Sequence, residues 1–152
     1  MYFYNLIKDL VKNKKTIMYV DMDGVIAAYD FGKPLEFDKK RPLYTNIKKL
    51  EEVSKLENLE LRILSACRTI DQINEKNEWL DKYAPFFTKD NRHILARELY
   101  DYMDSCDMKT MYLEKMNDPF QIIVLDDDNL ILKTIHKMLD HVICIQDSEM
   151  ID

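Results

Sequence analysis

Two carboxylates stand two residues apart in Asp21-Met22-Asp23-Gly24-Val25, directly after an apolar run. Carboxylates this close raise each other's pKa unless a cation offsets their repulsion. Hard divalent cations such as Mg²⁺ are bound by oxygen ligands, so the pair indicates a metal site. The alternative is a solvated turn or a helix cap. Gly24, one of two glycines in the chain, favours the metal site because it marks an unusual backbone conformation or a close backbone approach.

Three more carboxylates, Asp126, Asp127 and Asp128, follow a second apolar run. Asp128 is expected to cap the next helix, whose N-terminus favours negative charge. A cap with solvated neighbours explains one or two of the three, and the third indicates a metal ligand. The register stays open at this point, with Asp126 and Asp127 as the predicted ligands.

Four further polar side chains stand where apolar runs end or helices are expected to begin. The Ser65 hydroxyl could hold a phosphate oxygen or belong to a plain turn. Lys109 is expected at a helix start, which disfavours a cation on dipole grounds and so indicates a role, the alternative being a solvated lysine. Arg68 and Arg97 could clamp a phosphate or pair with the acidic surface.

These side chains need elements that bring them together, and the hydrophobic pattern supplies them. Short apolar runs of the kind found in strands buried on both faces occupy Thr16–Val20, Leu59–Leu64, His93–Ala96, Gln121–Leu125 and Val142–Ile145. Helical patterns occupy Tyr2–Val11, Asn46–Leu56, Asp71–Tyr83 (with Asp71 as N-cap), Met108–Met116 and Asn129–Leu139. This alternation predicts an α/β, Rossmann-like fold, a five-stranded parallel sheet with helices on both faces. Ligands of such sheets bind at the carboxyl ends of the strands, where the polar side chains stand.

The length of 152 residues and the 47% hydrophobic content predict one domain with a substantial core. A small flap is expected as an insert at about residues 27–44. Its aromatic side chains, Tyr29, Phe31 and Phe37, could stack on a base or simply cover the core. The N-terminal helix is expected either to cover the sheet or to form an interface, and a homodimer stays open.

Charge and composition exclude several classes of function. The net charge is −6, so strong general binding to nucleic acid is not expected. Two glycines cannot supply a glycine-rich nucleotide loop. The sequence has neither a membrane-length apolar stretch nor a signal-peptide pattern. Three scattered cysteines are typical of a reducing compartment, and the cytoplasm is the expected location.

Taken together and in this order, the motifs resemble those of the haloacid-dehalogenase-like phosphohydrolase superfamily over roughly residues 16 to 146. Asp21-Met22-Asp23-Gly24-Val25 matches the first motif, which is the most specific, and Ile63-Leu64-Ser65 matches the second. Lys109 is the best match to the third, with Lys115 as a weaker candidate. Ile123-Val124-Leu125-Asp126-Asp127 matches the fourth.

The resemblance implies a reaction and a cofactor. Asp21 would attack phosphorus to form an aspartyl-phosphate, and Asp23 would protonate the leaving oxygen and later activate water. Mg²⁺ would be held by Asp21, by the backbone carbonyl of Asp23, and by Asp126 and Asp127.

The same resemblance implies how the phosphate is held. Ser65 and Lys109 would bind its remaining oxygens, and Arg68 is a further candidate for phosphate binding.

Four segments carry a closer resemblance: Asp21–Ala27, Leu64-Ser65-Ala66, Asn77-Glu78-Trp79-Leu80 and Leu125-Asp126-Asp127. On these the chain is most similar, within the superfamily, to small 5'(3')-deoxyribonucleotidases, which implies a small phosphorylated substrate, a nucleotide. It lacks their helical cap. A phosphatase acting on nucleic-acid ends or phosphoproteins is therefore an alternative. A catalytically silent binding module or a receiver-like signalling module is another. The position of Lys109 before the acidic pair favours the hydrolase over the receiver.

Overall fold

A parallel β-sheet forms the centre of the computed structural model, which describes residues 1–29, 36–116 and 119–151. The strands of the described chain are β1 (Thr16–Val20), β2 (Leu59–Cys67), β3 (Arg92–Ala96), β4 (Gln121–Asp126) and β5 (Ile143–Gln146). Their spatial order is β3-β2-β1-β4-β5, and every neighbouring pair is parallel. The predicted α/β fold and all five predicted strands are confirmed.

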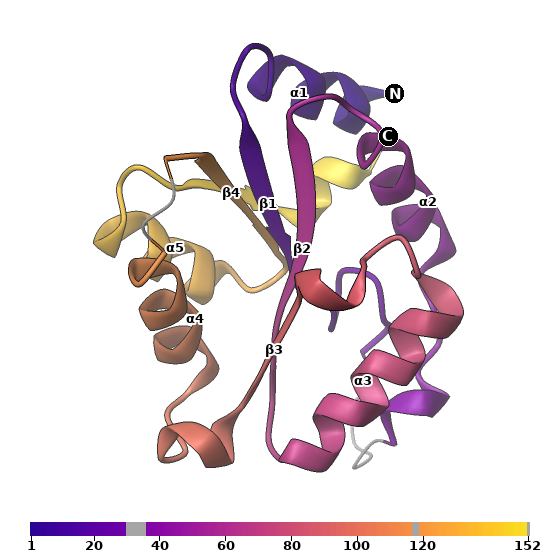
Figure 1. Cartoon of the computed structure of the whole chain (residues 1–152), viewed down its shortest axis with the longest axis vertical. Helices are drawn as coiled ribbons and strands as arrows, with labels where there is room; N and C mark the ends of the chain where they lie inside the picture. The colour runs from indigo at the N-terminus through magenta and orange to yellow at the C-terminus, as the bar shows by residue number, and fades with distance from the viewer. Residues whose placement is uncertain (30–35, 117–118, 152) are drawn as a thin grey trace.

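Helices cover both faces of this sheet (Figure 1). One face carries α1 (Tyr2–Leu10), α2 (Tyr44–Val53) and α3 (Ile70–Tyr83), and the other carries α4 (Ser105–Glu114) and α5 (Asn129–Met138). Along β1, Met18 and Val20 belong to the core under α1, α2 and α3, while Ile17 and Tyr19 belong to the core under α4 and α5. Both faces of β1 are therefore buried, which is why its sequence is a continuous apolar run rather than an alternating one.

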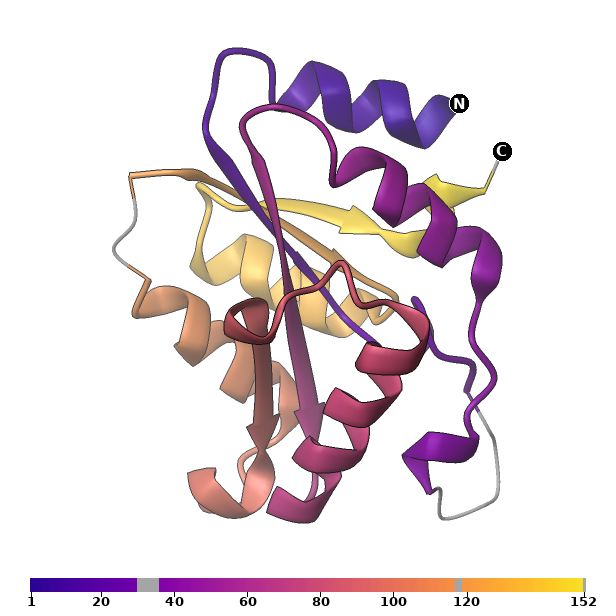
Figure 2. The same ribbon diagram turned by 45° about the vertical axis from the view of Figure 1, so that its right-hand side comes forward.

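The N-terminal helix belongs to the core rather than standing apart from it. Phe3 and Ile7 of α1 are buried, and α1 packs against α2 and the short helix η4 (Asp147–Met150). Lys49 on α2 donates a hydrogen bond to the carbonyl of Met150, which joins α2 to η4. Figure 2 shows α1 beside α2, with the two ends of the chain close together.

β2 runs three residues beyond its predicted end at Leu64 because it has two different partners. Its first half pairs with β1 as far as Ile63, and its second half pairs with β3 from Ile63 to Cys67. Ser65 is consequently inside the strand rather than after it. The apolar pattern of one strand does not reveal such a change of partner.

Two helix starts also differ from the prediction, and local capping explains both. α3 begins at Ile70 with Thr69 as its N-cap, not with Asp71, because the Gln72 side chain accepts hydrogen bonds from the preceding backbone amides. α4 begins at Ser105, three residues before the predicted start at Met108, because the Asp104 side chain caps it. The prediction that Lys109 stands at the helix start is therefore wrong, since Lys109 lies in the second turn.

The insert after the first motif leaves and returns through a short antiparallel contact. Ala27 pairs with Pro42, and the Ala28 amide donates to the Arg41 carbonyl at 2.9 Å. Phe31 lies outside the described residues. On the returning side, η1 (Phe37–Lys39) packs against α3. None of the helices described in the chain is both long and apolar enough to cross a membrane.

Candidate active site

The register of the sheet brings two of the predicted carboxylates side by side. Val20 of β1 lies opposite Leu125 of β4, so Asp21 and Asp126 follow on neighbouring strands. The Asp21 amide donates a hydrogen bond to the Leu125 carbonyl at 3.0 Å, which extends this pairing by one step. This place is the switch point of the sheet, because the chain leaves β1 for β2 on one side while β4 lies on the other.

An acidic cluster with one lysine occupies the switch point. Asp21, Asp126 and Asp127 each offer a carboxylate oxygen within 4.8 Å of the others. Buried Lys109 reaches in from α4, and its Nζ lies 3.0 Å from Asp21 Oδ1 and 2.7 Å from Asp126 Oδ2. Three carboxylates against one ammonium leave two negative charges in excess when all are ionised. The predicted grouping of these four residues is thus present in the structure.

Burial makes this charge costly. It raises the pKa of Asp21 to about 6, opposed by the charge of Lys109 and supported by Asp126 and Asp23. Burial, together with the charge of Asp21, also raises the pKa of Asp127 to about 6. Burial alone would lower the pKa of Lys109, but Asp21 and Asp126 outweigh it and hold that pKa above its ordinary value. The lysine therefore stays charged while two carboxylates resist ionisation.

The donor set fits a divalent cation. Among the described residues, Asp127 Oδ1 is buried and has no hydrogen-bond partner. A buried carboxylate oxygen without a donor carries an uncompensated desolvation cost, which a cation would remove. The oxygen ligands and the excess of negative charge suit Mg²⁺. Asp21, Asp126 and Asp127 are the residues that would hold it.

Gly24 stands where no other residue fits comfortably. Its φ is +80°, a conformation that L residues rarely adopt. A Cβ at this position would lie 2.2 Å from Asp127 Oδ2 and 2.5 Å from Tyr29 Cε2. Both the unusual conformation and the close approach predicted for Gly24 are present, and together they let the Tyr29 hydroxyl bond the Asp127 carboxylate.

Asp23 points its carboxylate to a different set of partners, two lysines that sequence reasoning missed. Lys40 Nζ donates to Asp23 Oδ1, and Lys76 Nζ lies 3.1 Å from Asp23 Oδ2. Burial would raise the pKa of Asp23, but the charges of Lys76 and Lys40 hold it below its ordinary value. One signal was available: Lys76 falls on the apolar stripe of α3, between Ile73 and Leu80. Lys40 stands in a run of basic residues and gives no such signal.

The remaining predicted site residues are placed differently from one another. Ser65 is fully buried, and its hydroxyl accepts a hydrogen bond from Lys76 Nζ at 2.7 Å, so Lys76 links it to Asp23. Arg68 is exposed beyond β2, and within the described part of the chain its guanidinium makes no ion pair with the acidic cluster. Arg97 donates to the carbonyls of Met103 and Tyr102 at 2.9 Å each, which is a structural role.

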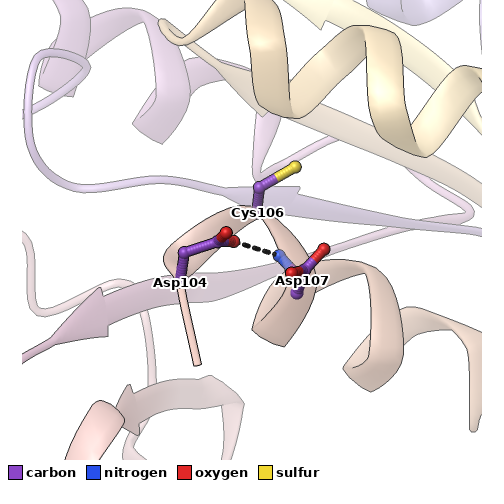
Figure 3. A group of neighbouring side chains, drawn as sticks. All are labelled: Asp104, Cys106 and Asp107. Atoms are coloured by element: carbon purple, nitrogen blue, oxygen red, sulfur yellow. Dashed lines mark hydrogen bonds between the residues drawn. The ribbon is translucent and has the colours of Figure 1, made fainter. Parts of the chain in front are cut away.

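A second group of potential metal ligands lies at the start of α4 (Figure 3). Asp104, Cys106 and Asp107 offer ligand atoms within 4.8 Å of one another, and both carboxylates are exposed. The Asp104 carboxylate accepts a hydrogen bond from the Asp107 amide at 2.9 Å, as an N-cap does. Capping accounts for this group, and its consequence for the site is to start the helix that carries Lys109.

Known proteins resemble the chain in structure only. The chain matches no protein-family model and no curated protein. A chain of the Pnkp1/Rnl/Hen1 RNA repair complex superposes with a TM-score of 0.69 at 19% identity, over 88% of this chain and 42% of that one. The N-terminal part of the protein BF1531 from Bacteroides fragilis contains a phosphatase domain complexed with Mg. It superposes with a TM-score of 0.57 at 14% identity, over 93% of this chain and 39% of that one.

A class C acid phosphatase from Bacillus anthracis with tungstate bound superposes with a TM-score of 0.55 at 15% identity, over 97% of this chain and 76% of that one. The chain spans less than half the length of the first two matching chains. These likenesses concern the fold: five parallel strands around a switch point, with helices on both faces. The chain therefore has a Rossmann-like α/β fold, which it shares with these solved structures.

Proposed function

We propose that the chain is an Mg²⁺-dependent phosphomonoester hydrolase that forms an aspartyl-phosphate on Asp21. The observation that supports this most strongly is the surroundings of Asp21. Its carboxylate is buried at the switch point, Lys109 bonds one of its oxygens, and Asp127 beside it keeps a buried oxygen without a partner. The likeness to two solved structures described as phosphatases supports the same reaction.

In the proposed first step, an oxygen of Asp21 attacks phosphorus. The bond from phosphorus to the leaving oxygen breaks, and that oxygen keeps the electron pair and takes a proton from Asp23. Lys109 offsets negative charge beside the nucleophile. Mg²⁺, when held by Asp21, Asp126 and Asp127, would reduce the repulsion between the anionic nucleophile and the anionic phosphate.

In the second step, water attacks the phosphorus of the aspartyl-phosphate. Asp23 accepts the proton of that water, the bond from phosphorus to Asp21 breaks, and inorganic phosphate leaves. The charges of Lys76 and Lys40 hold the pKa of Asp23 below its ordinary value, which favours the ionised carboxylate that accepts this proton. The first step uses the protonated form, which an anionic phosphate beside Asp23 would favour by raising that pKa.

The proposed substrates are (deoxy)nucleoside monophosphates. Tyr29, half exposed beside Asp127, is available to contact a base. Phe37 is not available, because it is buried against Trp79 with ring centroids 5.8 Å apart. Phosphorylated nucleic-acid ends are a second candidate, favoured by the likeness to a chain of an RNA repair complex.

The experiment is phosphate release from deoxy- and ribonucleoside monophosphates, p-nitrophenyl phosphate, a phosphopeptide and 5'- and 3'-phosphorylated oligonucleotides. Each is run with Mg²⁺ and with EDTA, for the wild type and Asp21→Asn. We expect Mg²⁺-dependent release that the substitution abolishes, and the preferred ester decides between the two substrate classes. No release from any ester would contradict the proposal, as would release that survives Asp21→Asn.

A further inference from the structure

The two oxygens of the Asp23 carboxylate each have their own buried ammonium group. Lys40 donates to Oδ1 and Lys76 to Oδ2, the latter at 3.1 Å. Lys40 is 7% exposed and Lys76 is 3% exposed. Lysine is almost never buried unless paired, and burying a charge costs several kcal/mol. One lysine would neutralise one carboxylate, so the second ammonium leaves a positive charge in excess on this side of the site.

Two segments far apart in the sequence cooperate to place these ammonium groups. Lys76 lies on α3, while Lys40 follows η1, whose Phe37 is buried against Trp79 of α3. The Trp79 indole N–H donates to the Lys40 carbonyl at 3.0 Å. The Lys40 and Lys76 Nζ atoms each lie 5.0 Å from the centroid of the Phe37 ring, within cation–π range.

This arrangement keeps Asp23 apart from the acidic cluster. Lys109 bonds Asp21 and Asp126 on one side, and Lys40 and Lys76 bond Asp23 on the other. The site is therefore divided into a half with excess negative charge, suited to a cation, and a half with excess positive charge around the proposed acid and base. Lys76 also bonds the Ser65 hydroxyl and the Ala66 carbonyl, at 2.7 and 2.8 Å, which fixes its own position.

We propose that Lys40 and Lys76 are positioning residues for Asp23, which hold its carboxyl group where the leaving oxygen departs and offset the negative charge that develops on that oxygen. This inference rests on the proposed function and adds two residues to its machinery. Charges held in place beside an atom where charge develops stabilise the transition state more than water does, because they need no rearrangement during the reaction. An ion pair that only stabilises the fold would have no such link to the leaving group.

The leaving group provides the test. A nucleoside monophosphate releases a strongly basic alkoxide oxygen that needs Asp23, while p-nitrophenyl phosphate releases a weakly basic phenolate that needs little help. We expect Lys40→Met to lower kcat/KM at least tenfold more for the nucleoside monophosphate than for p-nitrophenyl phosphate. Lys76→Met is expected to act in the same direction, and Lys40→Arg to restore most of the loss. kcat/KM includes leaving-group departure but not the later hydrolysis of the phosphoenzyme.

The ratio of the two kcat/KM values does not depend on how much of a variant is folded, because both substrates are measured on one preparation. Lys39→Met is the matched control, since the Lys39 side chain is 73% exposed and pairs with Glu36. Its ratio should equal that of the wild type. Equal losses on both esters, or no loss on either, would overturn the inference while leaving the proposed function intact. If the wild type prefers a phosphorylated oligonucleotide, that ester takes the place of the nucleoside monophosphate in the ratio. A wild type that hydrolyses no ester of the panel with Mg²⁺ would overturn both the inference and the proposed function.

Discussion

The Asp127 carboxylate is the point in the site where negative charge is least compensated. One oxygen has no partner among the described residues, and the charge of Asp21 acts on it directly. Its pKa of about 6 lies above the ordinary 3.8, so ionisation weakens the folded state. The stability that a protonated Asp127 allows is present below pH 3.8 and lost as the pH rises through about 6.

Asp127→Asn should therefore stabilise the metal-free protein at neutral pH. Because the side chain is partly exposed, the gain is discounted for screening to about 1 kcal/mol. The gain over wild type should be absent near pH 4, grow as the pH rises through about 6, and then level off. Urea unfolding in EDTA across this pH range measures it. A variant less stable than wild type at pH 7 would contradict the uncompensated charge.

Gly24→Ala tests the close contact on the other side of the same carboxylate. The added Cβ meets Asp127 Oδ2 at 2.2 Å in a backbone conformation with φ +80°. Backbone strain of this kind costs on the order of 1–3 kcal/mol, and the collision adds to it. We expect a loss of at least that size in urea unfolding. A variant as stable as wild type would show that Asp127 and Tyr29 can move aside.

The motifs predicted the acidic cluster because the topology brings three positions to one edge of the sheet. Asp21 directly follows β1, Asp126 is the last residue of β4, and Lys109 lies on α4. The two lysines on Asp23 escaped because each is recognisable only through its partner. Lys40 lies in an exposed-looking basic run. Lys76 donates a hydrogen bond to Ser65, eleven positions earlier in the sequence. That contact could not be predicted because β2 extends past the apolar run and so contains Ser65.

Among the elements, the start of α5 gives the aspartates of one run different roles: Asp128 caps the helix, and Asp126 and Asp127 belong to the proposed metal site. The Asp128 side chain accepts hydrogen bonds from the Leu130 amide at 2.9 Å and the Ile131 amide at 3.4 Å. This is the capping role predicted for it. The Asp128 amide in turn donates to Asp126 Oδ1 at 3.0 Å, which orients that carboxylate toward Lys109.

Asp128→Ala should lower stability by about 1 kcal/mol through loss of the cap, while the rise in melting temperature on adding Mg²⁺ remains. Asp126→Asn should instead reduce the rise in melting temperature that Mg²⁺ produces, without removing the helix cap. Thermal unfolding with and without Mg²⁺ compares the two variants. Loss of the Mg²⁺ response in Asp128→Ala would show that Asp128 holds the metal, which contradicts the assignment to Asp126 and Asp127.

Element types followed from periodicity, and element ends followed from caps that periodicity does not show. α3 and α4 start where the side chains of Gln72 and Asp104 accept hydrogen bonds from backbone amides. Each start depends on one side chain, so a repeating hydrophobic pattern does not reveal it. The short helix η1, three residues long, has too few turns to produce a periodic pattern. It is nevertheless the element that carries the chain to Lys40.

Across the whole molecule, both ends of the chain belong to one core. The N-terminal helix α1 packs against α2 and against η4 near the C-terminus, in a core that α3 shares. Ile7 is 0% exposed within that core. The sheet order and the two-faced core could be predicted in outline from alternating strands and helices. The packing of α1 on η4 could not, because it depends on where the last residues return after β5.

Ile7→Ala should cost about 3 kcal/mol, the usual effect of removing a buried isoleucine side chain. If residues 1–152 are one domain, the fluorescence of Trp79 on α3 and the far-ultraviolet circular dichroism should lose stability together, in one transition. Urea unfolding followed by both signals measures this. Two separated transitions would show that α1 unfolds independently of the rest.

Asp21 is identified as the nucleophile, or excluded, by trapping the phosphoenzyme. The protein is mixed with a ³²P-labelled nucleoside monophosphate and Mg²⁺, quenched in acid within one turnover, and digested to locate the label. We predict an acid-stable, hydroxylamine-sensitive label on the peptide that contains Asp21, absent from Asp21→Asn. Turnover with no label on the chain, or a label on another residue, would contradict Asp21 as the nucleophile.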